Sequence, residues 1–197
     1  MTAQIDDSFL HHGIEYSIAG ISAGKILDMP ALGLRPTMGS TACWRGYQAV
    51  FALQEERLVL ERLDVNLFEG GEGWPRGREL QGPVLNGVTP RPGPSGSFNN
   101  RYEGLGLPLE YSGGVLLGIG FIHELYVHMG FHPAWKYERV VELVFERGIL
   151  LREADRSRQL AEFRGMMSAR ALEPGAEASP EDIARFVEET FDRSYRF

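Results

Sequence analysis

The chain contains one cysteine, Cys43, among its 197 residues. A single cysteine cannot form an intramolecular disulfide, so the disulfide-stapled folds of small secreted proteins are excluded. Zinc sites of the finger type, which need two or more cysteine ligands, are excluded as well. Because Cys43 lies in an apolar stretch, we interpret it as a small buried residue and not as a nucleophile.

The sequence also lacks a long apolar run. A membrane-spanning helix needs about 20 consecutive apolar residues, and the longest apolar segment, residues 115–122, is interrupted by Gly118 and Gly120. Asp6 and Asp7 stand where a signal peptide would have a positive region followed by an apolar one. The sequence therefore predicts a cytoplasmic protein that does not bind membranes.

No cluster of lysines or arginines offsets the acidic residues, and the formal net charge is −7 with a pI near 5.3. Nucleic-acid binding needs a concentrated basic surface, so we expect no nucleic-acid partner. An acidic surface is compatible with a basic protein partner. The hydrophobic content of 43% and the charged content of 24% are ordinary for globular proteins, and the length suits a single domain over residues 1–197.

Two segments predict β-hairpins. In residues 47–67 the arms YQAVFAL and RLVLERLDVNL flank QEE, and in residues 136–153 the arms KYERVVELVF and ILLRE flank ERG. Side chains in these arms alternate with a period of two, and Gly148 is suited to the second turn. In residues 137–146 the glutamates fall on one face, which is typical of a sheet with one solvated side. An amphipathic helix is the alternative for this arm, but its branched and aromatic residues favour a strand.

Between these hairpins lies a glycine- and proline-rich segment. Residues 69–114 hold 12 of the 24 glycines and 6 of the 11 prolines, too many for regular structure, so we predict a loop region. Such a loop is either a solvated insertion or a surface that contacts a substrate or partner. In the second case Trp74, Phe98 and Tyr102 are the candidate contact residues.

The C-terminal part changes to a helical period. Ser157 to Leu172 places apolar residues at helical spacing and is ended by Glu173-Pro174-Gly175. A second helix is predicted over 179–194, with Ser179 as its N-cap and Pro180 at its first position.

Two motifs carry a family resemblance. The run STACWRGYQAVFALQEERLVLERL and the later LYVHMGFHPAWKYERVVELVFERGIL resemble segments of uncharacterised bacterial β-rich proteins. In those proteins a W-R-G-Y segment leads into one hairpin, and a Y-V-H-M-G-F-like segment precedes another. The resemblance covers about a third of the chain. It implies a β-rich single domain and brings no known activity or functional residue with it.

The segment HELYVHMGFHP, residues 123–133, has three of the five histidines. His123 and His128 are five residues apart, whereas the zinc-protease motif H-E-x-x-H needs a separation of four. Five residues place the two rings on different faces of either a helix or a strand. His128 and His132 have the right separation, but Gly130 and Pro133 predict that the chain bends in this segment, so that the separation does not place the two rings on one face. Two alternatives stay open: a metal site built from His128, His132 and a carboxylate such as Glu124, and a general acid or base role for one histidine. We favour a structural role for these histidines, and therefore predict neither a metal site nor a cofactor.

Trp44, Arg45 and Tyr47 form the best candidate recognition group. Arginine offers a planar set of donors for a carboxylate or phosphate, and the two aromatic residues add flat apolar area. The alternative is that Trp44 and Tyr47 belong to the core and Arg45 pairs with a glutamate from a neighbouring strand. No serine-hydrolase motif is present, and no catalytic residue is predicted.

Together these features predict an α+β fold: mainly antiparallel sheet, curled or closed into a barrel, with two C-terminal helices. Whether the chain is an enzyme stays open. The first functional hypothesis is a non-enzymatic binding module, such as an immunity or accessory protein that engages a protein partner. The alternative is a small-molecule-binding barrel or small enzyme whose pocket is lined by Arg45, Tyr47, His128 and Tyr137.

Overall fold

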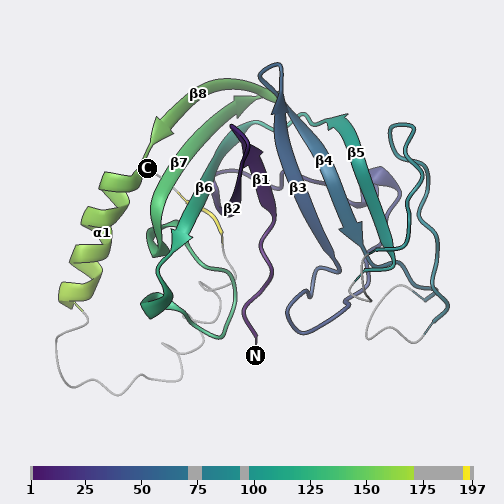
Figure 1. The fold of residues 1–197 in the computed structure, drawn as a ribbon, viewed down its shortest axis with the longest axis horizontal. Helices are drawn as coiled ribbons and strands as arrows, with labels where there is room; N and C mark the ends of the chain where they lie inside the picture. The colour runs from purple at the N-terminus through teal and green to yellow at the C-terminus, as the bar shows by residue number, and fades with distance from the viewer. Residues whose placement is uncertain (1, 71–76, 94–97, 171–192, 196–197) are drawn as a thin grey trace.

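The computed structural model describes residues 2–70, 77–93, 98–170 and 193–195, and shows one sheet curled into a barrel (Figure 1). Its strands are β1 (Ser8–His11), β2 (Ile14–Ile21), β3 (Tyr47–Gln54), β4 (Arg57–Val65), β5 (Asn100–Pro108), β6 (Gly113–Phe121), β7 (Tyr137–Glu146) and β8 (Ile149–Asp155). The described helices are α1 (Ser157–Arg170) and the short 3-10 helices η1 (Pro30–Leu32), η3 (His123–Leu125) and η4 (Ala134–Lys136).

Seven strands close the barrel in the order β3-β1-β2-β6-β7-β8-β4, and β4 returns to pair with β3. All neighbouring strands are antiparallel except β1 and β3, which run parallel. The joint between β8 and β4 is short, because it consists of one bridge between Arg57 and Ile149. From Val59 onward the same edge of β4 pairs with β5. Beyond this single bridge β8 and β4 part, and β5 takes the place of β8 along the edge of β4 (Figure 1).

Both predicted hairpins are confirmed, as β3–β4 and β7–β8. Their turns use positive φ at two successive residues, Glu55 and Glu56 in one and Arg147 and Gly148 in the other. This conformation matches the right-handed twist of the flanking strands. The barrel and the β-rich character expected from the sequence are thus present.

The interior of the barrel is filled by side chains. Alternate residues of the strands, among them Phe9, Phe51, Leu63 and Leu143, are fully buried in one cluster. Residues from the segment between β2 and β3, including Leu34, join the same cluster and cover it from one end. A ligand in the centre of the barrel is therefore excluded, and any ligand site must lie at an end or on the outside.

The outer face of β7 differs from the prediction of a half-solvated surface. Glu142 is only 4% exposed, because Arg152 and Arg156 pair with its carboxylate and Tyr195 donates a hydrogen bond to it. Val140 packs nearby in a smaller apolar cluster that includes Leu160 of α1. The glutamate spacing predicted the strand correctly, but it did not predict that α1 and Tyr195 cover part of its outer face.

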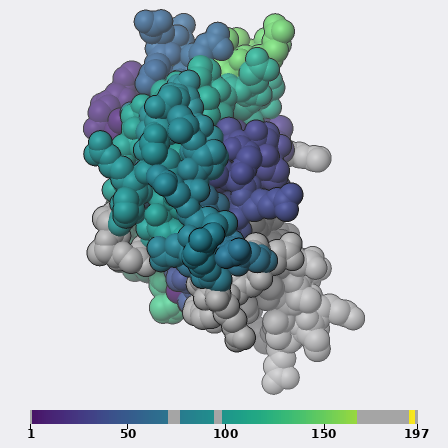
Figure 2. Space-filling model, turned by 90° about the vertical axis from the view of Figure 1, so that its right-hand side faces the viewer, coloured from purple at the N-terminus to yellow at the C-terminus, as the bar shows by residue number. Residues whose placement is uncertain are grey.

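The prediction of a loop over 69–114 needs correction, because it contains β5 and the start of β6. The glycines that suggested a loop sit inside the strand: Gly104 and Gly106 have positive φ, and the β4–β5 register shifts between Leu60 and Arg62. The described part of the region forms much of the teal surface in Figure 2, and its Leu85 and Leu105 belong to the buried cluster of the barrel. Tyr102, for example, is fully buried and donates a hydrogen bond to the Pro83 carbonyl.

The first predicted C-terminal helix is confirmed as α1. The second, over 179–194, falls almost entirely outside the described residues, and its described end is extended, with Ser194 bridging to Ile21. The described residues thus hold one α-helix, and the expected pair is not borne out. Within the same residues no helix is long and apolar enough to cross a membrane.

Candidate functional site

The site lies at the end of the barrel where β1 and β3 begin. Because β1 is parallel to β3 and antiparallel to β2, the chain segments before β1, before β3 and after β2 meet at this end. They enclose a cavity of about 320 Å³ that we call the charged cavity. It is lined by Asp7, residues 21–27, Arg45, Tyr47, Phe51, Phe131, Arg193 and Ser194.

Two larger hollows lie on the outside of the molecule. One of 630 Å³ lies between α1 and η4, and one of 860 Å³ lies beside residues 67–70 and 80–83. The charged cavity differs from both because a buried carboxylate paired with arginines lines it and the core side chain Phe51 reaches it. Buried charged groups beside an opening are the usual setting of a binding site.

A buried carboxylate holds two arginines at this end. The Arg45 Nη1 donates to Asp7 Oδ2 at 2.6 Å and its Nη2 to Asp7 Oδ1 at 3.2 Å, which is a two-point pair. Arg193, far away in the sequence, donates to the same Oδ2 at 3.2 Å. Burial alone would raise the pKa of Asp7, but the charges of Arg45 and Arg193 outweigh burial and lower it. Asp7 is therefore ionised, and the backbone N–H of Ala49 also donates to it.

The neighbouring carboxyl group, Asp6, behaves differently. Its Oδ1 is 3.9 Å from Arg193 Nη1 and has no hydrogen-bond partner among the described residues. Burial raises the pKa of Asp6 to about 7, against the attraction of Arg193. The Tyr137 hydroxyl donates to Asp6 Oδ2 at 3.3 Å, and burial raises the pKa of Tyr137 as well. One protonated and one ionised carboxyl group thus stand side by side at pH values below neutrality.

The tyrosine ring has its place because Gly118 has no side chain. A Cβ at Gly118 would lie 2.6 Å from Tyr137 Cγ, closer than packed carbon atoms approach. Gly118 interrupts the apolar run of β6, and its role is to admit this ring.

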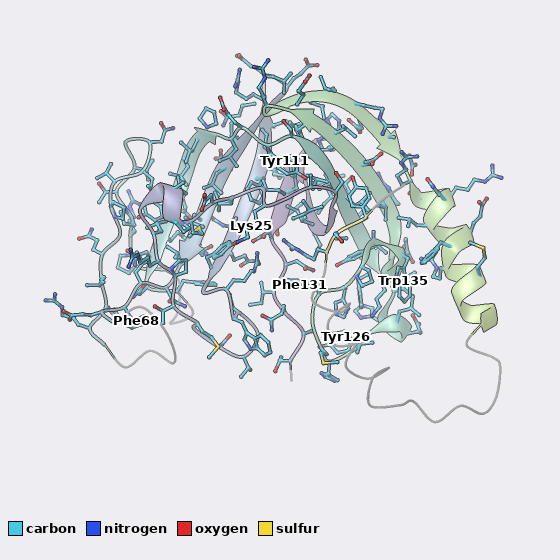
Figure 3. All side chains as sticks on the ribbon, turned by 180° about the vertical axis from the view of Figure 1, so that it is seen from behind. Lys25, Phe68, Tyr111, Tyr126, Phe131 and Trp135 are labelled. Atoms are coloured by element: carbon cyan, nitrogen blue, oxygen red, sulfur yellow. The ribbon has the colours of Figure 1, made fainter. Side chains whose placement is uncertain are left out.

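Aromatic rings and one further cation complete the lining. Phe131 contacts both guanidinium groups, with its ring centre 4.6 Å from Arg193 Cζ and 5.3 Å from Arg45 Cζ. Such contacts between a cation and a ring face are attractive. Lys25, exposed on the segment after β2, lines the same cavity. Figure 3 shows Lys25 and Phe131 near the middle of the molecule, below the arch of strands.

The lining carries a net positive charge within an acidic protein. Lys25, Arg45 and Arg193 contribute three positive charges and Asp7 one negative charge, which leaves +2 in a chain of net charge −7. These lining residues include no imidazole or thiol side chain, and the one carboxylate is already paired with two arginines. The donor set therefore suits an anion and not a metal ion.

The chain matches no protein-family model, no curated protein and no solved structure. The site must be interpreted from its own geometry.

The structure brings together three of the residues that the sequence singled out. Arg45 and Tyr47 line the charged cavity, and Tyr137 reaches Asp6 beside it. Arg45 pairs with a carboxylate, but the partner is Asp7, immediately before β1, and not the glutamate of a neighbouring strand that one alternative expected. Trp44 lies next to this group but is 42% exposed and does not line the cavity.

The remaining candidates lie elsewhere. Tyr102 is in the core, and Trp74 lies outside the described residues. His128 is exposed and packs edge-on against Tyr126 at 4.7 Å between ring centres, away from the cavity lining.

The histidine-rich segment forms η3 and an irregular stretch before η4, and is not a strand. His132 is buried against Phe121 and Tyr126, at 4.6 and 5.2 Å between ring centres. Burial, with the nearby Lys136 charge, lowers the pKa of His132 to about 4. Among the described residues, His123, His128 and His132 do not converge on a shared metal position.

Five residues on which the site depends were missed from the sequence: Asp6, Asp7, Lys25, Phe131 and Arg193. Asp6 and Asp7 served only as an argument against a signal peptide, although adjacent acidic residues before an apolar strand are a weak signal of a buried pair. Arg193 is 186 positions from Asp7, and no local pattern connects the two.

Proposed function

We propose that the chain binds a small molecule with an apolar body and a carboxylate group in the charged cavity. The observation that carries this proposal is the net charge of +2 on the lining of a cavity in a protein of net charge −7. A carboxylate entering the cavity meets guanidinium groups already held in place by Asp7, so little side-chain order is lost on binding.

The apolar part of the ligand has a matching surface. Ile21, Leu27 and Phe51 line the cavity, and Phe131 lies beside the two arginines. A volume of about 320 Å³ is at the small end of the range for ligand pockets, ~300 to 1,000 Å³. These features favour a compact monocarboxylate over a long-chain lipid.

The proposal is binding and not catalysis. The Asp6 carboxyl group, with a pKa near 7, would suit proton transfer, but Asp6 is not among the residues that line the cavity. The earlier hypothesis of a protein partner stays a prediction. Its support is the acidic net charge and the 42% exposed Trp44 beside the cavity.

The test compares octanoate with octanamide, which has the same chain without the charge. Lys25 is one of two lysines and the other, Lys136, is buried, so the reductively methylated Lys25 amine gives a reporter signal in NMR titrations. We expect octanoate to shift this signal and to bind at least about 10-fold more tightly than octanamide, as calorimetry on the unmodified chain would measure.

Charge-reversal variants locate the site. Lys25→Glu lowers the charge of the lining to zero and should weaken the binding of octanoate about 3- to 10-fold. An exposed charge pair contributes ~0.2–1 kcal/mol, and the substitution both removes one attraction and adds one repulsion of that size. Arg57→Glu makes the same change of net charge at the β3–β4 turn, outside the lining, and should leave the affinity unchanged. Equal affinity for octanoate and octanamide, equal effects of the two variants, or no binding at millimolar octanoate would each overturn the proposal.

A further inference from the structure

A second group of polar side chains lies where the β1–β2 hairpin meets β8, apart from the charged cavity. His11 Nε2 is 3.2 Å from Glu153 Oε1, and His12 Nε2 is 3.9 Å from Glu153 Oε2. One ligand atom from each residue lies within 4.8 Å of the other two. We call these three residues the hairpin cluster.

The backbone conformation explains how two adjacent histidines share one position. Consecutive residues of a strand point to opposite faces, so a regular strand would separate the two rings. His12, however, has φ of +49° and Gly13 has φ of +76°, which together make the two-residue turn of the hairpin. The turn brings the His12 ring over the His11 ring, with 4.0 Å between ring centres.

The carboxylate comes from the opposite wall of the barrel. β1 pairs with β2 and β3, whereas β8 pairs with β7 and, through one bridge, with β4. Glu153 is directly opposite Leu143, a core residue, so its side chain is on the interior face. His11 is two residues after the core residue Phe9 and shares that face. The cluster therefore spans the barrel and does not follow a sheet ladder.

The His11 ring has an unsatisfied atom that faces the cluster. Its side chain is 4% exposed, and Nε2 makes no hydrogen bond among the described residues despite its short distance to Glu153. Buried polar atoms in folded proteins almost always have a partner. An electron-pair acceptor placed between His11, His12 and Glu153 would supply one.

We propose that the hairpin cluster binds a zinc ion through His11 Nε2, His12 Nε2 and the Glu153 carboxylate. Zinc at ~2.0–2.2 Å from each ligand in tetrahedral geometry separates the ligand atoms by about 3.3 Å. The two histidine nitrogens are 3.2 and 3.9 Å from the Glu153 oxygens, and the ligand atoms of the three residues all lie within 4.8 Å of one another. Side-chain movements of about 1 Å would bring them to the separation that zinc needs. His12 is 76% exposed and Glu153 42% exposed, so both can adjust, and the fourth coordination position faces water.

The test uses zinc alone on the untagged full-length chain, freed of metal by a chelator and dialysis. Calorimetry should show one equivalent of Zn²⁺ bound, and Co²⁺ in its place should give the intense visible absorption of a tetrahedral site. Asparagine tolerates positive φ, so His12→Asn should fold normally and lower the affinity at least about 10-fold. Glu153→Gln, which changes an exposed side chain of β8, should do the same.

His128→Asn is the matched control, because it removes an exposed histidine from the chain's other histidine-rich segment. It should leave zinc binding unchanged, and circular dichroism should show that all three variants fold. A chain that binds no zinc, that binds several equivalents weakly, or whose binding is reduced equally by His128→Asn would refute the proposal.

Discussion

Replacing Asp6 by asparagine tests the electrostatics of the site most directly. Asp6 is buried beside the ionised Asp7, and the attraction of Arg193, 3.9 Å away, does not compensate for the loss of water. Its pKa is raised from the ordinary value of 3.8 to about 7, first by burial and then by the charge of Asp7. Asparagine has nearly the same shape and resembles the protonated form.

The sign of the effect follows from the two pKa values. Between about pH 4 and pH 7 the folded protein keeps a proton that the unfolded chain has released, so stability falls as the pH rises through this range. Below it both states are protonated, and above it both are ionised. Each pH unit within the range costs about 1.4 kcal/mol. Asp6 therefore lowers the free energy of unfolding by about 2.5 kcal/mol between pH ~5 and pH ~8.

Urea denaturation of the wild type and Asp6→Asn at these two pH values measures the effect. The difference between the two proteins removes the contributions of all other titrating groups, and the variant should gain about 2.5 kcal/mol relative to the wild type on going to the higher pH. Asp28→Asn, which alters an exposed carboxylate, controls for the loss of one negative charge. A relative stability of Asp6→Asn that is constant or falls with pH would show that burial does not hold Asp6 protonated beside the ionised Asp7.

Two further predictions use the same assay. Burial holds the pKa of His132 at about 4, below its ordinary value of 6.5. Between these two pH values His132 is protonated in the unfolded chain and neutral in the folded protein, so the free energy of unfolding of the wild type rises by up to about 3 kcal/mol from pH ~4 to pH ~6.5. His132→Phe should lack this gain, and an unchanged pH dependence would contradict the burial of a neutral ring. Arg156→Met removes the partner 2.7 Å from the buried Glu142, which keeps Arg152 and Tyr195, and should cost about 1.5–3 kcal/mol. Arg158→Met removes the pair between Arg158, 94% exposed, and Glu162, 64% exposed, and should cost less than about 0.5 kcal/mol. Equal costs of the two substitutions would refute the argument.

The predictable part of the fold is the part encoded by neighbouring residues. The β3–β4 and β7–β8 hairpins follow from side chains that alternate in the sequence, and the start of α1 follows from its helical spacing. β5 was missed because Gly104 and Gly106 are typical of loops when only the local sequence is considered. Its pairing with the free edge of β4 outweighs that local tendency, and nothing within residues 100–108 reports the edge.

The site divides in the same way. Arg45 and Tyr47 were found because an arginine beside aromatic residues is an unusual local composition. Asp7, the partner of Arg45, is 38 positions before it in the sequence, and Arg193 is 186 positions after Asp7. No local pattern connects residues so far apart. The hairpin cluster was missed for another reason: adjacent histidines on a strand point apart, and only the positive φ of His12 reverses this.

The Asp7 network is not required by stability alone. Buried ion pairs lose much of their attraction to the cost of removing both charges from water, and apolar residues of similar volume often give an equally stable protein. Met or Leu side chains at Asp7, Arg45 and Arg193 would fill this end of the barrel, as leucines fill its centre. They would not hold two guanidinium groups against Phe131 at the edge of a cavity that Lys25 also lines. The arrangement is therefore consistent with the proposed binding of an anion, which the octanoate titration tests.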